Sequence, residues 1–234
     1  MIGPSMDVRR GHPEELLWPF NEVKRKHAPP ELFLRGDADL LVAGPCVAIV
    51  GSRKPSREGI ARASRLARML AERGIIVASG LAEGIDTAAH EAAIAAGGRT
   101  IAVLGTPLDD CFPAKNRGLQ DRIMREHLAV SQFAAGTSVG RHTFPMRNRT
   151  MALVSDATVI VEASDRSGTI NQGWEALRLG RSLWLAESLL QNAALLFPRK
   201  LEFYGALALS DATLPALLDL LPSGRRDAGA ELPF

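Results

Sequence analysis

Short apolar runs alternate with amphipathic helical patterns along most of this chain, and this alternation restricts the possible folds most strongly. The runs typical of buried strands lie at 47–50, 75–78, 100–104, 129–133, 158–161 and 182–186. Helical patterns lie between them at 56–73, 86–96, 116–127, 145–155 and 169–179. Strand–helix–strand order favours parallel pairing with right-handed crossovers. The sequence therefore predicts an α/β fold with a doubly wound, mostly parallel sheet and helices on both faces, an extended Rossmann-like arrangement.

The 234 residues suit one α/β domain with short additions at its ends. We expect an N-terminal extension over 1–45, in which Leu32–Phe33–Leu34 forms a short strand, and a main domain over 46–221. A last strand at 206–209 and a closing helix capped by Ser210 or Asp211 complete the domain. Residues 222–234 have the composition of a loose C-terminal tail.

Composition excludes several classes of protein. The net charge is only +2, so a nucleic-acid site depends on local clusters of arginine and not on global charge. No apolar run approaches the roughly 20 residues that cross a membrane. Cys46 and Cys111 lack metal-ligand spacing, and this cysteine usage fits a reducing cytoplasm. We expect no metal, no cofactor and no membrane partner.

Glycine and hydroxyl residues follow several of the predicted strands. In an open parallel sheet, ligands bind beyond the carboxyl ends of the strands. A strand that turns sharply into a helix offers backbone N–H groups to an anion, and Arg53 adds a guanidinium suited to phosphate. We therefore expect a phosphorylated ligand here, either a nucleotide or a nucleic-acid strand. The residues assigned to this edge are Gly51, Ser52, Arg53, Lys54, Gly80, Gly84, Ser167, Gly168 and Thr169.

A second basic cluster lies at 141–149, with Arg141, Arg147, Asn148 and Arg149 around Phe144. Arginines interleaved with an aromatic ring are typical of single-strand binding, because charge holds the backbone and the ring stacks on a base. The alternative, a core phenylalanine with arginines paired to local acids, is equally open. Lys115 lies at a predicted helix start and extends this basic rim.

Two other patterns are more readily structural. Arg57, Arg62, Arg65 and Arg68 fall on the polar face of the helix at 56–73, which is typical of a solvated face. Asp86 and His90 lie four residues apart on one helical face, as a general-base pair would. We favour a loop-bracing Asp86 and a His90 bonded inside the fold.

The chain resembles the DprA/Smf family of DNA-processing proteins, over roughly residues 32–221. The matching segments are VAIVGSRK at 47–54, SGLAEGID at 79–86, TIAVLG at 100–105, FP at 112–113 and RHTFPMRNR at 141–149. VEA at 161–163 and RSGT at 166–169 follow in the same order. The resemblance implies a Rossmann-like domain that binds single-stranded DNA in a basic pocket without catalysis. It also implies a homodimer that protects strands in natural transformation and DNA recombination and helps to load a RecA-type recombinase.

The sequence departs from the family pattern in ways that leave other functions open. Family members commonly carry a helical domain before the Rossmann-like core and often a winged-helix module after it. This sequence matches the core alone, so it resembles a reduced form of the family. Glu162, Glu175 and Glu187 fall near the ligand edge, where carboxylates would repel a phosphate chain. One alternative is a sensor of a nucleotide derivative in the wider LOG-like superfamily. A less favoured one is a LOG-like phosphoribohydrolase with Glu175 or Glu162 as the acid.

The segment that begins with the sixth strand is more apolar than a small closing segment needs. Part of it fits a dimer contact, and ordinary core is the alternative. Its large apolar residues are Leu183, Trp184, Leu189, Leu190, Leu195, Leu196, Phe203 and Tyr204.

Overall fold

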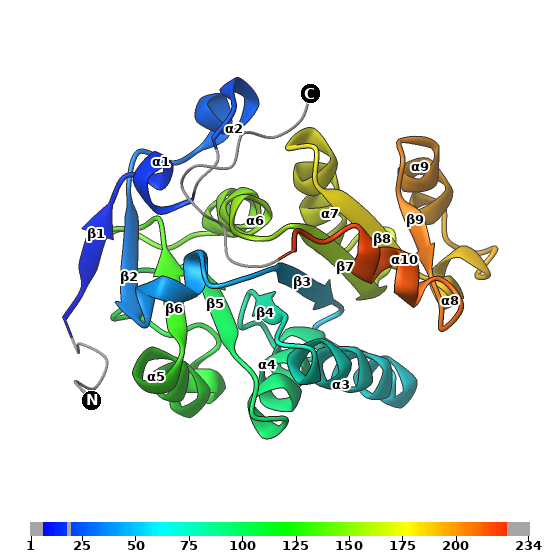
Figure 1. Cartoon of the computed structure of the whole chain (residues 1–234), viewed down its shortest axis with the longest axis horizontal. Helices are drawn as coiled ribbons and strands as arrows, with labels where there is room; N and C mark the ends of the chain where they lie inside the picture. The colour runs from blue at the N-terminus through cyan, green and yellow to red at the C-terminus, as the bar shows by residue number, and fades with distance from the viewer. Residues whose placement is uncertain (1–6, 18–19, 224–234) are drawn as a thin grey trace.

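The computed structural model describes residues 7–17 and 20–223, which form one nine-stranded sheet in the order β1-β2-β6-β5-β4-β3-β7-β8-β9 (Figure 1). The strands from β6 to β9 in that order pair in parallel, and β1 and β2 are antiparallel. The predicted doubly wound, mostly parallel sheet is confirmed. The strands are β1 (Arg9–Gly11), β2 (Leu32–Gly36), β3 (Cys46–Gly51), β4 (Ile76–Ser79), β5 (Thr100–Leu104), β6 (Leu128–Ser131), β7 (Ala157–Glu162), β8 (Ser182–Ala186) and β9 (Leu207–Leu209).

Helices cover both faces of the sheet: α6 and α7 lie on one face, and α3, α4 and α5 on the other (Figure 1). The helices are α1 (Pro13–Leu16), α2 (Glu22–His27), α3 (Arg57–Glu72), α4 (Ile85–Ala95), α5 (Arg117–Glu126), α6 (Thr143–Val154), α7 (Thr169–Arg178), α8 (Glu187–Leu190), α9 (Phe197–Phe203) and α10 (Leu214–Asp219). Two short 3₁₀ turns are η1 (Ala38–Leu41) and η2 (Ala114–Asn116). No helix in the described ranges combines the length and apolarity that a membrane crossing needs.

The central strand β3 shows why this sequence makes a two-faced core. All six of its residues are buried. Val47 and Ile49 pack with α3 and α4 on one face, and Ala48 and Val50 pack with α6 on the other, because side chains alternate along a strand. A continuous apolar run is what a strand covered on both faces requires.

The ends of the chain add to this sheet. The predicted strand at 32–34 is confirmed as β2, which pairs antiparallel with β6, and β1 pairs with β2. The segment 1–45, set apart above as an extension, thus contributes two strands to the main sheet.

Several boundaries differ from those that the sequence predicts. Helix α6 begins at Thr143, two residues before Pro145. The closing helix α10 is preceded by Thr213 at its N-cap, so the expected cap at Ser210 or Asp211 is wrong. The Thr213 hydroxyl accepts from the Ser210 N–H, which holds a turn ahead of the helix. Most of the expected tail at 222–234 lies outside the described residues.

The chain reverses its winding between β3 and β7. The helix after β3 covers one face of the sheet and the helix after β7 covers the other (Figure 1). The two connections therefore leave in opposite directions and open a crevice at the carboxyl ends of these strands. Ligands of open α/β sheets bind at such a reversal point.

Candidate nucleic-acid interface

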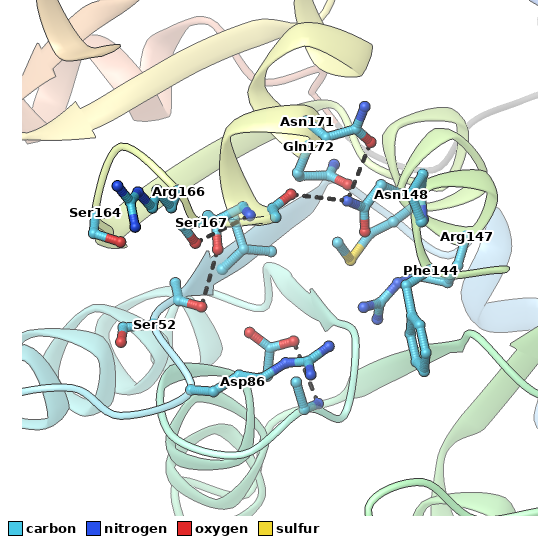
Figure 2. A pocket seen from close by; sticks show the side chains of 18 of the residues that line it. Ser52, Asp86, Phe144, Arg147, Asn148, Ser164, Arg166, Ser167, Asn171 and Gln172 are labelled. Carbon is cyan, nitrogen blue, oxygen red and sulfur yellow. Dashed lines mark hydrogen bonds between the residues drawn. The ribbon is translucent and has the colours of Figure 1, made fainter. Parts of the chain in front are cut away.

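A cavity of about 530 Å³ lies at this crevice, and we call it the edge pocket. The turn after β3, the start of α4, helix α6 and the loop into α7 surround it (Figure 2). Of the residues predicted for the site, those that line it are Gly51, Ser52, Arg53, Lys54, Arg147, Asn148, Ser167, Gly168 and Thr169. The sheet thus brings together residues up to 118 positions apart, as the Thr169–Gly51 contact illustrates.

The turn after β3 is fixed by its own backbone. The Ser52 N–H donates to the Glu162 carbonyl at 2.7 Å, and the Ile85 N–H donates to the Ser52 carbonyl at 3.2 Å. The Ser52 N–H is therefore occupied and does not point freely at a ligand. A Cβ at Gly51 would lie 2.6 Å from the Ile85 side chain, so close packing requires glycine here.

The side chains of the turn remain available to a ligand. Arg53 and Lys54 are both exposed on the pocket rim. The Arg53 guanidinium lies 5.4 Å from the centre of the Phe144 ring, a cation–π contact. Phe144 in turn packs 5.4 Å from the exposed Phe112 ring. A cation and two rings thus lie together beside the pocket.

The buried carboxylate of Asp86 and the buried guanidinium of Arg147 lie together in the floor of the edge pocket. Burial raises the pKa of Asp86, and the Arg147 charge and the N–H groups of Ala82, Gly80 and Gly51 act in the opposite direction. Arg147 is only 6% exposed and donates to the Val103 carbonyl at 3.0 Å. Its charge is balanced by Asp86, so Arg147 is part of the protein interior as well as of the pocket wall.

The glycines of the 79–86 loop allow the close packing around these buried side chains. A Cβ at Gly80 would lie 1.5 Å from the Arg147 guanidinium, so only glycine leaves room for that side chain. Gly84 has φ +79° and would carry its Cβ 2.4 Å from the Ser52 carbonyl. Neither glycine lines the edge pocket, and both support the residues that do.

Two side chains tie α6 and β3 to the loop before α7. The Asn148 Nδ2 group lies 3.3 Å from both the Gly168 carbonyl and the Asn171 side chain, to which it donates. The Thr169 hydroxyl donates to the Gly51 carbonyl at 3.0 Å. These contacts hold Ser167 and Gly168 in the pocket lining, and Figure 2 shows Ser167 there.

Three of the predicted cations lie outside the edge pocket. Lys115 pairs with Glu83 at 2.9 Å, and Arg141 is exposed away from the lining. Arg149 pairs with Glu175 at 3.1 Å.

Two of the three carboxylates expected near this edge, Glu162 and Glu175, are engaged within the protein, and Glu187 lies outside the lining of the edge pocket. Arg149 and Arg178 hold Glu175 from two sides, at 3.1 and 2.9 Å. Glu162 accepts from the backbone N–H and the hydroxyl of Ser56, the N-cap of α3. Glu162 and Glu175 are also absent from the lining, so they do not repel an anion in the edge pocket directly.

Sequence reasoning missed four polar residues of the pocket. Ser164, Arg166, Asn171 and Gln172 also line it (Figure 2). Arg166 begins the RSGT segment quoted above, and its position next to Ser167 could have predicted that it lines the pocket. The two amides lie on the first turns of α7, where only the packing of α6 against α7 shows which side faces the pocket.

His90 is a structural residue, as the favoured interpretation predicts. Its Nδ1 atom lies 2.7 Å from the Thr100 hydroxyl, which donates to the Val77 carbonyl, so Nδ1 carries the proton. Burial lowers the pKa of His90 to about 3.

This pKa predicts an acid-sensitive fold. An unfolded chain protonates His90 near pH 6.5, whereas the folded protein takes up that proton only near pH 3. Stability is thus lost as pH falls through 6.5 towards 3, by about 3 kcal/mol at pH 4. His127, whose pKa burial also lowers, acts in the same direction. Urea unfolding of His90→Gln should show a much flatter pH dependence, while exposed His142→Gln should match the wild type; equal slopes in all three would contradict this.

The fold and the pocket define a Rossmann-like protein whose pocket is lined by arginine and lysine side chains, and comparison with known sequences identifies its family. The model of the DNA recombination-mediator protein A family matches residues 12–208. The chain therefore belongs to this family, and the resemblance to DprA/Smf proteins is confirmed. It is 41% identical over 167 residues to DNA processing protein DprA of Streptococcus pneumoniae, covering 71% of this chain and 58% of that protein. It is 33% identical over 191 residues to DprA of Bacillus subtilis, covering 81% and 64%.

Solved structures agree with this assignment. The X-ray structure of S. pneumoniae DprA superposes with a TM-score of 0.78 at 34% identity, over 89% of this chain and 74% of that one. DprA of Helicobacter pylori, whose structure concerns its single-stranded DNA binding mode, gives 0.78 at 24% identity, over 94% and 100%. A molybdenum cofactor carrier protein of Chlamydomonas reinhardtii shares the fold alone, with a TM-score of 0.52 at 19% identity over 76% and 98%. The chain spans about three-fifths of the length of the first two curated relatives.

Proposed function

We propose that this protein is a non-enzymatic, cytoplasmic single-stranded DNA-binding protein, and that the edge pocket holds the phosphate backbone of the strand. One observation carries the proposal: three exposed cations, Arg53, Lys54 and Arg166, line the pocket without a carboxylate partner among the described residues. The one acid in the lining, Asp86, is buried against Arg147. The pocket therefore presents net positive charge to a ligand, as a phosphate backbone requires.

Aromatic rings beside these cations favour a nucleic-acid strand. Phe112 is 52% exposed, and Phe144 lies between it and Arg53. Base stacking on such rings accepts any base and complements the contacts to phosphate. The solved H. pylori relative binds single-stranded DNA, and this supports the same ligand here.

The placement of the carboxylates favours binding over nucleotide hydrolysis. Glu162 caps α3, and Glu175 is held by two arginines. A general acid must reach the reacting atom, and neither side chain lines the edge pocket. The two acids considered for the phosphoribohydrolase alternative, Glu162 and Glu175, are therefore not placed to act on a ligand in the edge pocket.

Salt dependence tests this proposal. Three cations on the strand predict a slope of about −2 for the logarithm of the association constant against the logarithm of salt concentration. Fluorescence anisotropy of a labelled single strand, titrated at several salt concentrations, measures this slope. A slope near zero would contradict phosphate binding by the edge pocket.

We further propose that the protein forms a homodimer through an apolar patch at the β9 end of the sheet. Phe203 is 84% exposed, Leu196 78% and Tyr204 58%, and Leu207 on the edge strand β9 is also exposed. Trp174 contacts Tyr204 in an edge arrangement at 5.1 Å. Large apolar groups gathered in this way are typical of a contact surface. Trp184 and Leu183, in contrast, are buried core residues.

Phe203→Glu is expected to yield a monomer, because a charge at the centre of an apolar contact is costly to desolvate. Sedimentation velocity measures the effect, with exposed Glu202→Gln on the same helix as the control. A wild type that sediments as a monomer would contradict the dimer proposal.

Assistance to a RecA-type recombinase is the part of the proposal that rests on the family resemblance. If it holds, the protein speeds RecA assembly on a strand coated with single-strand-binding protein, and Arg53→Glu does not. Equal RecA assembly rates with and without the wild-type protein would contradict it.

A further inference from the structure

A second hollow of about 590 Å³ lies between the middle of α3 and the carboxyl ends of β7, β8 and β9, and we call it the α3 pocket. Its floor is apolar, with Leu66, Met69 and Val161 among the lining residues. Its walls come from α3 and from the segments after β8 and β9, which Figure 1 shows at the same end of the sheet. Side chains of both charges stand on these walls.

The charges of the α3 pocket leave one cation and one anion for a ligand. Arg65 pairs with Asp211 at 2.9 Å, so these two side chains neutralise each other. Arg62 on α3 and Glu187 at the start of α8 make no ion pair within residues 7–17 and 20–223. A matching ligand thus carries an anion and a hydrogen-bond donor at its two ends, with a flat or apolar part between.

We propose that the α3 pocket binds a second nucleotide of the strand held in the edge pocket. Its phosphate contacts Arg62, its base lies on the apolar floor, and its exocyclic amino group donates to Glu187. A nucleotide has this order of anion, ring and donor. The inference rests on the proposed single-strand function and extends it to a further site.

The two pockets lie within reach of one short strand. Lys54 lines the edge pocket, α3 begins three residues later, and Arg62 lines the α3 pocket. Three residues of extended chain from Lys54 to Arg57 span at most about 11 Å and the helical stretch from Arg57 to Arg62 about 8 Å, so the Cα atoms of Lys54 and Arg62 lie at most about 20 Å apart. Nucleotides of a duplex strand are spaced by about 3.4 Å, and those of an extended strand by more. A few linking nucleotides therefore suffice.

Glu187 gives this site a base preference. A carboxylate accepts from the amino group of cytosine, whereas thymine presents a carbonyl oxygen at the corresponding position. The polar side chains of Ser188 and Gln191 line the same wall and offer further hydrogen bonds. We expect the α3 pocket to favour cytosine over thymine by about tenfold, the lower end of the discrimination of one good base contact.

Anisotropy with four labelled strands tests the inference: oligo-dC and oligo-dT, each about 4 and about 15 nucleotides long. Arg62→Glu should weaken binding of the long dC strand about tenfold and leave the short strands unchanged, since these fill only the edge pocket. Arg68→Glu changes the same charge on the same helix outside both pockets and serves as the matched control. Glu187→Gln should reduce the preference for long dC over long dT.

The outcomes separate this inference from the proposed function. If Arg53→Glu removes strand binding and Arg62→Glu leaves it intact, the proposal for the α3 pocket is overturned and the proposed function stands. An equal loss in Arg62→Glu and Arg68→Glu also overturns it, because general charge then explains the effect. A wild type that binds none of the four strands overturns the proposed function itself.

Discussion

Arg53→Glu is expected to lower the affinity for a single strand by at least about 100-fold. The substitution removes a charge-assisted contact to phosphate and adds a repelling carboxylate, together about 3 kcal/mol or more. Arg53 is exposed and makes no hydrogen bond or ion pair within the described ranges, so the fold should be unaffected. Anisotropy at low salt measures the affinity, and thermal unfolding verifies that the melting temperature is unchanged.

Arg99→Glu is the matched control for this prediction. Arg99 is exposed and immediately precedes β5, so it lies at the amino edge of the sheet, opposite the edge pocket. The same change in net charge there should alter affinity only slightly. Equal losses in Arg53→Glu and Arg99→Glu would mean that general charge, and not the edge pocket, holds the strand.

Arg147→Met is expected to destabilise the fold by about 3 kcal/mol. The guanidinium lies buried beside Gly80, donates to the Val103 carbonyl and faces the Asp86 carboxylate. Its removal leaves a buried acid without the opposite charge, which typically costs 3–5 kcal/mol. Urea unfolding at pH 7 measures the loss, and binding to a strand should weaken as well because the pocket floor changes.

The double variant Asp86→Asn with Arg147→Met isolates the charge effect. Asparagine still accepts from the N–H groups of the loop but carries no charge, so part of the lost stability should return. A double variant whose loss equals the sum of the two single losses would show that Asp86 and Arg147 do not interact.

The strand–helix alternation and the glycine-containing turns were readable from the sequence because they are local. The turn after β3 and the RSGT loop were placed at one edge by the rule that parallel strands end together. The roles of Arg147 and Gly80 were not readable. They depend on contacts between α6, β5 and the 79–86 loop, which no local pattern encodes.

The partners of surface cations were similarly hidden. Lys115 finds Glu83 and Arg149 finds Glu175 only after folding, so a basic cluster in the sequence overstated the cations free for a ligand. The short strand β1 escaped notice because three residues carry little periodicity. The cap at Thr213 was missed because the neighbouring Ser210 and Asp211 are residue types that cap helices equally well.

Competition between a single strand and its possible substitutes tests the central claim most directly. A labelled strand of about 30 nucleotides is bound to the protein, and unlabelled single strand, duplex DNA and mononucleotides are added in turn while anisotropy is followed. Our account predicts displacement by the unlabelled single strand at comparable concentration, and much weaker displacement by duplex and mononucleotides. Failure of the protein to bind the strand, or full displacement by a mononucleotide at low concentration, would contradict it and favour a nucleotide sensor.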